Sequence, residues 1–120
     1  MTDRDREAGG VTVTACLALL ALLAMTVLVA QVGVVVAARH RVQSAADLAA
    51  LAAAGALDEG EVAGCRRAGD IAARMEVRVA GCVVRGWDVT VTVRARISVG
   101  PLGVREARAT ARAGPVGEEK

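Results

Sequence analysis

The sequence predicts an α+β protein anchored in a membrane, with a long N-terminal transmembrane helix, a short second helix and a small antiparallel β-sheet. Three observations predict this class: an uncharged apolar run, an Ala- and Leu-rich stretch behind it, and a later segment that alternates apolar and polar residues. The expected parts are an N-terminal tail (1–10), a transmembrane helix (11–38), a helix extension (39–57), a small extracytoplasmic α+β domain (58–113) and a disordered tail (114–120).

Length and charge narrow the possible functions. A chain of 120 residues has room for one small domain. It carries 15 basic and 13 acidic residues, which gives a net charge of +2. These charges are scattered outside the apolar run and form no basic cluster, so the composition gives no reason to expect a nucleic-acid partner.

The first predicted element is the membrane span. Residues 11–38 contain no charged side chain, and Gln31 is their only strongly polar member. A transmembrane helix needs about 20 apolar residues, so the run crosses a bilayer with length to spare. It is also longer than the apolar region of a secretory signal peptide. An alternative is a secreted protein released after Ala38, because Val36 and Ala38 have the small-residue spacing that signal peptidase accepts.

The orientation of the span is less clearly indicated. Two arginines precede the apolar run and two follow it, so the positive-inside rule gives a tie. The short tail and the cysteine pair of the polar half favour a cytoplasmic N-terminus and an external C-terminal domain. The expected location is therefore the cell membrane, as a single-pass protein in contact with the lipid bilayer.

The helix is expected to continue behind the span to Leu57. Residues 42–57 contain no proline and are dominated by Ala and Leu, the strongest helix formers. Ala45, Ala49 and Ala53 recur at helical spacing and form a stripe of small residues. Such a stripe lets another helix approach closely, so it is predicted to pack against helices of partner subunits. The alternative is that it packs on its own domain.

A short second helix is predicted over 61–75, after an acidic break at 58–61. Cys65 lies on this helix and Cys82 on the following strand. A disulfide between them is expected in an external domain, and closing this loop stabilises the fold by about 3 kcal/mol. The alternative is two ordinary buried thiols. Cys16, inside the apolar run, is expected to be free.

The last part of the chain reads as three strands. Residues 77–84 are rich in β-branched side chains, and 87–99 alternate with a period of two, starting from Trp87 on the apolar face. Arg85 and Gly86 separate them, which predicts a hairpin, and Gly81 is expected to host a bulge. Residues 107–113 alternate Ala with Arg and Thr, which predicts a third strand at the edge of the sheet.

Chemistry-bearing residues are sparse. The single histidine, His40, lies between two arginines at the expected membrane edge. No nucleophile has a candidate base beside it, no glycine-rich phosphate loop follows a strand, and the cysteines have no metal-binding spacing. Glu76 and Asp88 could meet across the hairpin, but arginines nearby favour an exposed charge ladder. The expectation is a protein that is not an enzyme and has no catalytic residue, metal, cofactor or small-molecule substrate.

A motif follows the apolar run, in the form Arg-His-Arg-Val-Gln-Ser-Ala-Ala-Asp-Leu-Ala-Ala-Leu-Ala-Ala-Ala over residues 39–54. It resembles the signature of TadE/TadG-like proteins of Flp pilus assembly, with Gln43, Ala46 and Asp47 at the motif positions. The chain is similar to a small actinobacterial TadE-like group found beside helicase and secretion genes. In that group a cysteine pair and a Trp- or Leu-Asp-Val-x-Val strand follow, as Cys65, Cys82 and residues 87–91 do here.

The resemblance implies a pilin-like fold and a minor pilin or pseudopilin-like component of a Tad (Flp) pilus or related secretion apparatus. Its implied partners are other Tad-like pilus or secretion subunits. One residue departs from the pattern. Prepilin peptidase substrates usually carry Glu five residues after the cleaved glycine, where this chain has Thr14 or Ala15. That difference argues against cleavage by this peptidase.

A different function is also compatible with the sequence. The predicted sheet exposes a set of arginines on its polar face, namely Arg78, Arg94, Arg96, Arg108 and Arg112. This face would suit a membrane-tethered extracytoplasmic module that binds an acidic partner.

Overall fold

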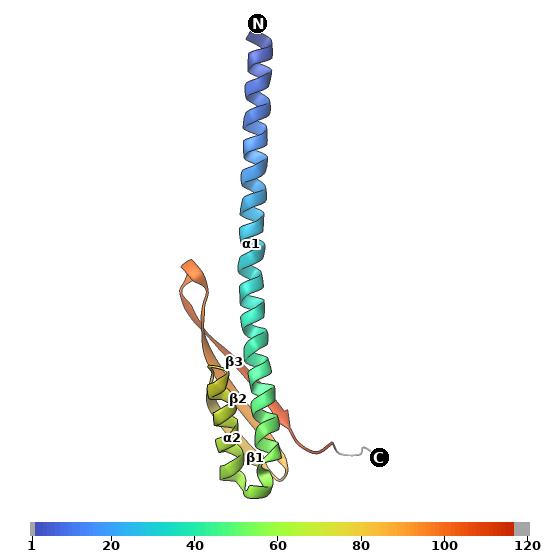
Figure 1. The fold of residues 1–120 in the computed structure, drawn as a ribbon, viewed down its shortest axis with the longest axis vertical. Coiled ribbons are helices and arrows are strands. Elements are labelled where there is room, and N and C mark those ends of the chain that lie inside the picture. The colour runs from blue at the N-terminus through green and yellow to red at the C-terminus, as the bar shows by residue number, and fades with distance from the viewer. Residues whose placement is uncertain (1, 117–120) are drawn as a thin grey trace. The chain divides into compact units, whose positions relative to one another are not determined.

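A computed structural model describes residues 2–116 and confirms the predicted α+β class. It contains a long helix, a short helix and a three-stranded antiparallel sheet (Figure 1). The elements are α1 (Thr2–Gly55), the 3-10 turn η1 (Leu57–Glu59), α2 (Glu61–Arg74), β1 (Arg78–Arg85), β2 (Asp88–Ser98), the 3-10 turn η2 (Gly100–Leu102) and β3 (Val104–Ala113). The chain divides into two compact units, Met1–Val34 and Val35–Lys120.

Helix α1 begins earlier than the sequence indicated. The described residues before Val11, expected as a tail, are helical from Thr2 onward. They contain no proline, so nothing in this stretch prevents the helix from extending toward the N-terminus. At its other end α1 stops at Gly55, two residues before the predicted end, and the 3-10 turn at Leu57 leads into α2. Of the predicted disordered tail, residues 114–116 have no regular structure and 117–120 lie outside the described residues.

The first unit ends at Val34 and holds the charged start of α1 and most of the apolar run. Its large side chains are exposed on every side of the helix, as at Leu17, Leu20 and Leu23. Its threonine hydroxyls donate hydrogen bonds to carbonyls one turn back, as in the 2.8 Å bond from Thr14 to Gly10 and the 2.9 Å bond from Thr26 to Leu22. These bonds satisfy the hydroxyl donors within the helix, which suits an apolar environment. Among the described residues, one helix is long and apolar enough to cross a membrane.

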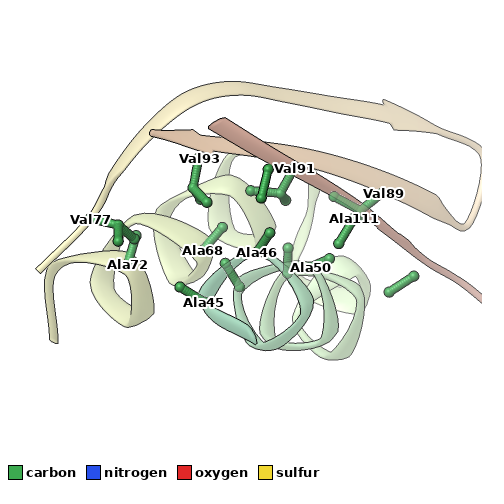
Figure 2. Packing of buried hydrophobic residues seen from close by; sticks show 14 of the residues in the cluster. Ala45, Ala46, Ala50, Ala68, Ala72, Val77, Val89, Val91, Val93 and Ala111 are labelled. Carbon is green, nitrogen blue, oxygen red and sulfur yellow. The ribbon is translucent and has the colours of Figure 1, made fainter. Parts of the chain in front are cut away.

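The second unit is a two-layer domain. The C-terminal part of α1 and helix α2 pack on one face of the sheet, whose strand order is β1-β2-β3 (Figure 2). On the sheet side the core is formed mainly by Val89, Val91 and Val93 of the central strand, each fully buried. The helices contribute mainly alanines, with Val42 and Leu57 at the ends of the row. The core is therefore thin and contains no aromatic side chain among the described residues.

The strand pairing confirms the predicted hairpin, and it places the bulge at Ala80, one residue before the Gly81 that was predicted to host it. Strands β1 and β2 pair from Arg85↔Asp88 to Arg78↔Arg94, and the register shifts between Val79 and Gly81. Strand β3 pairs with β2 and begins at Val104, three residues before the predicted start. Trp87 differs from the prediction. It was expected on the apolar face of the strand, but it lies in the hairpin turn beside Gly86 and is 63% exposed.

Candidate functional site

The alanine stripe of α1 lies inside the domain. Ala45, Ala49 and Ala53 are each 0% exposed and belong to the hydrophobic core. They belong to the same cluster as the valines of β2 and the buried alanines of α2 and β3. In this structure the stripe packs on its own domain, the alternative that the sequence left open, and it presents no exposed surface to a partner subunit. Small side chains allow the helix to lie close to the sheet.

The three motif residues have two different roles. Ala46 is fully buried beside the stripe. Gln43 and Asp47 lie one turn apart on the exposed side of α1, and the amide Nε2 of Gln43 donates to Asp47 Oδ1 at 3.2 Å. The same amide donates to the main-chain carbonyl of Thr110 at 3.4 Å. The polar part of the motif thus links α1 to the edge strand β3, with Asp47 orienting the amide that makes the link.

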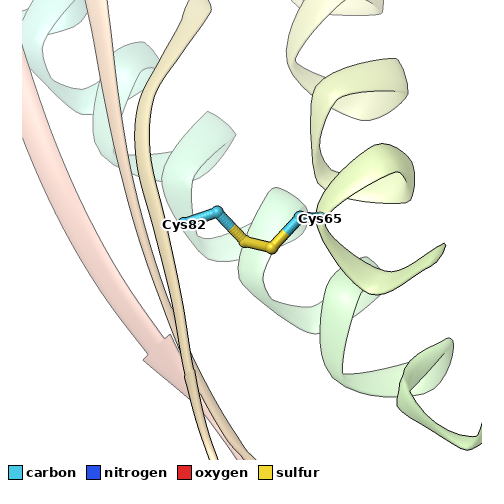
Figure 3. Close-up of a disulfide and its surroundings, with 2 residues drawn as sticks. All are labelled: Cys65 and Cys82. Atoms are coloured by element: carbon cyan, nitrogen blue, oxygen red, sulfur yellow. A yellow bond between two sulfur atoms is a disulfide. The ribbon is translucent and has the colours of Figure 1, made fainter. Parts of the chain in front are cut away.

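A disulfide joins Cys65 of α2 to Cys82 of β1, as predicted (Figure 3). The two Cα atoms are 5.9 Å apart, and the cysteines are 17 positions apart in sequence. The bond fixes α2 against the edge of the sheet opposite to β3. Cys16 is free and exposed on the apolar part of α1.

The outer face of the sheet carries the predicted arginines in a defined order. Arg78, Arg94 and Arg108 are neighbours across the three strands, and we call them the arginine rung. Like charges at such positions repel, and the nearest compensation is Glu106, 3.9 Å from Arg94. Arg96 stands opposite Glu106 in the register, whereas Arg112 forms a salt bridge with Asp88.

The two carboxylates considered for acid–base chemistry are not paired with each other. Asp88 contacts Arg112, and Glu76 lies 3.5 Å from Arg41 of α1. Both therefore belong to exposed ion pairs, the charge ladder that the sequence favoured. Within residues 2–116, no group of three or more His, Cys, Asp or Glu side chains is arranged to hold a metal ion. The residues described above therefore make packing contacts, hydrogen bonds and ion pairs.

Sequence reasoning missed one close contact and one cleft. Gly64 of α2 is buried against the end of α1, and a Cβ atom there would lie 2.9 Å from the carbonyl oxygen of Ala53. A glycine inside a predicted helix, with no turn to explain it, was the available signal.

The cleft lies between α1 and the far part of the β2–β3 hairpin. No local pattern indicates it, because its walls come from segments about sixty residues apart.

Part of the chain is similar to a known protein family. Residues 9–56 match the Flp pilus-assembly TadE/G-like family, so the resemblance predicted from the motif is confirmed over that segment. The chain is also 54% identical, over 52 residues, to the apoptosis inhibitor Rv3654c of Mycobacterium tuberculosis. This match covers 43% of the chain and 62% of the length of that relative. No solved structure matches the chain.

Proposed function

We propose that this protein is a minor pilin-like or pseudopilin-like structural or assembly component of a Tad (Flp)-type pilus or related secretion apparatus. The observation that carries the proposal is the extent of the family match. It covers residues 9–56, which hold the whole apolar run together with the alanine stripe and the Gln43–Asp47 motif. The matched segment therefore combines the proposed membrane anchor with the alanine stripe, which packs in the core of the domain.

Membrane anchoring is part of this proposal. The apolar run is uncharged and exposes large side chains throughout, which is unfavourable in water and favourable in lipid. We further propose a cytoplasmic N-terminus and an external domain, because a disulfide such as Cys65–Cys82 forms and persists in oxidising compartments. The partners are then other pilus or secretion subunits in the same membrane.

A deletion in the native organism tests the function. We expect loss of the gene to reduce surface pili, counted by electron microscopy, or the export of the proteins that the apparatus secretes. The full chain should restore both. A matched variant, in which an unrelated apolar helix replaces residues 11–34 and the domain is kept, separates anchoring from specific assembly. Unchanged pili and unchanged export in the deletion strain would contradict the proposal.

Topology is tested with a reporter that is active only outside the cytoplasm, fused to either end of the full chain. We expect activity at the C-terminal fusion alone. Sequencing the N-terminus of the mature protein distinguishes an anchored from a secreted form. A mature chain that starts at Arg39 would show release after Ala38 and would contradict anchoring.

A second candidate function is a membrane-tethered module that binds an acidic partner. The observation that favours it is the arginine rung, where three arginines lie side by side and Arg94 has the carboxylate of Glu106 at 3.9 Å. Binding of the full chain to polyglutamate tests it. A variant with Arg78, Arg94 and Arg108 all changed to Gln should lose this binding, and the Arg66→Gln/Arg67→Gln/Arg74→Gln variant of α2, at exposed positions, controls for the loss of three positive charges. Equal binding by the two variants would contradict this function.

A further inference from the structure

A cleft with a volume of about 920 Å³ lies within the second unit, between residues 35–43 of α1 and the far part of the β2–β3 hairpin. Its size falls in the range of small-molecule sites. The core ends at Val42 and Ala109, so beyond these residues the hairpin and the helix are no longer joined by buried side chains. The cleft is the space left between them.

One part of the cleft wall is apolar. Val35 and Val36 come from α1, and Ile97 and Val99 from the end of β2 and the residue after it. These side chains are at least partly exposed to solvent. Val35 and Val36 also belong to the apolar run that we propose to be anchored in the membrane, so this wall lies at its end.

The other part of the wall is basic. Arg39, His40 and Arg105 line the cleft, and the neighbouring Glu106 and Arg108 of β3 border it from strand positions that alternate onto the outer face of the sheet. Glu106 forms a salt bridge with Arg94 of the sheet. Within the described residues, neither Arg39 nor Arg105 has an ion-pair partner.

Arg105 occupies an unusual position in the strand. It stands opposite Ile97 in the register and follows the alternation of the alanines at 107, 109, 111 and 113, so it lies on the face of the sheet that the helices cover. Every other described residue of this face on β3 is Ala. Arg105 lies beyond Ala109, where the core ends, so its guanidinium is not packed among buried side chains. It lines the same cleft as Arg39.

We propose that this cleft binds an anionic phospholipid of the surrounding membrane. The phosphate would be held by Arg39 and Arg105, and the first part of an acyl chain would lie against Val35, Val36, Ile97 and Val99. The inference rests on the proposed membrane anchoring, because only then do these residues lie at the bilayer surface. Charge complementarity selects an anionic headgroup, and the apolar wall selects a lipid rather than free phosphate.

Native mass spectrometry of the full chain tests this inference. The protein is reconstituted in nanodiscs of phosphatidylcholine with a minor share of phosphatidylglycerol, and the phosphatidylglycerol retained after release is counted. The test variant is Arg39→Gln/Arg105→Gln. The matched control, Arg66→Gln/Arg67→Gln, removes the same charge from exposed positions of α2 outside the cleft. We expect retention to fall roughly fivefold per arginine, and about 25-fold in the test variant, with little change in the control.

Three results would overturn the lipid site: equal loss in both variants, equal retention of phosphatidylcholine and phosphatidylglycerol by the wild type, or displacement of the lipid by inorganic phosphate. An alkaline wash of membranes, done first, separates this failure from failure of the proposed anchoring. Wild type and both variants should remain in the membrane. If they are washed off, the anchoring is wrong and the lipid site falls with it, whereas retained protein without lipid selectivity contradicts the lipid site alone.

Discussion

The two parts of helix α1 use the same apolar residue types and bury them in opposite ways. In the first unit the large side chains point outward, and Leu20 is 61% exposed. In the second unit small side chains are buried, and Ala45, Ala49 and Ala53 are 0% exposed in the core of the domain. The difference teaches that the first part has no apolar partner among the described residues, whereas the second part has one. Lipid is the partner that we propose for the first part.

The comparison extends to stability. A core of alanines and a few valines buries little area per residue, and small domains of this kind usually need a covalent or external support. The Cys65–Cys82 disulfide supplies one such support to the domain. The apolar part of α1 needs none, because its backbone hydrogen bonds lie within the helix and are maintained in lipid.

The largest expected effect comes from placing a charge on each part. Leu20 and Leu51 are almost equally exposed, at 61% and 62%. Leu20→Arg should raise the apparent free energy of membrane insertion by about 3–4 kcal/mol, because the charge would lie in the hydrocarbon region. Leu51→Arg should have almost no effect on insertion. A glycosylation-based insertion assay on the full chain measures both, and equal effects of the two changes would break the comparison.

Removing the disulfide should be nearly as costly, but only for the domain. Replacing Cys65 and Cys82 together by Ser should lower the free energy of unfolding by about 3 kcal/mol, because the loop that the bond closes becomes unconstrained in the unfolded chain. Cys16→Ser is the control and should change nothing. Chemical unfolding in detergent measures the stabilities. Thiol labelling of the native protein provides an independent check, and Cys65 labelled without reductant would contradict the bond.

Introducing a large side chain into the alanine stripe should destabilise the domain by about 1–3 kcal/mol, the usual cost of overpacking a close-packed core. The change is Ala49→Phe, because Ala49 is fully buried. Ala73→Phe on the exposed side of α2 is the control, with an expected change within about 0.5 kcal/mol. Thermal unfolding followed by circular dichroism compares the two. If Ala49→Phe keeps wild-type stability, the stripe does not require small side chains for the domain to fold.

Two glycines of α2 should respond in opposite directions. Gly64→Ala would place a Cβ atom 2.9 Å from the carbonyl oxygen of Ala53, and we expect a loss of about 1–3 kcal/mol. Gly69 has no atom within 4 Å of such a Cβ, so Gly69→Ala should stabilise the helix by about 0.5–1 kcal/mol. The same unfolding measurement distinguishes them. Destabilisation of similar size in both variants would remove the close approach of α2 to α1 as the cause.

Local patterns predicted most of the secondary structure. The uncharged run at 11–38 and the alternation in β2 are signals contained within one segment, and both elements are present in the structure. The hairpin followed from Arg85 and Gly86, and the disulfide was expected from the isolated pair of cysteines in a small domain. For the candidate site, the sequence identified Gln43, Ala46 and Asp47 only through their resemblance to a family motif.

The tertiary structure decided what each face contacts. The alanine stripe has the same period whether it meets another subunit or its own sheet, and only the position of β2 and β3 places it in the core. Likewise, the Gln43 side chain donates a hydrogen bond to Thr110, 67 positions away in sequence. Arg39 and Arg105 line the same cleft across a similar separation. The sequence by itself determined the membrane-length helix and the strands, because their signals are periodic and local. Burial and partners were decided by packing between distant segments, which a one-dimensional pattern does not specify.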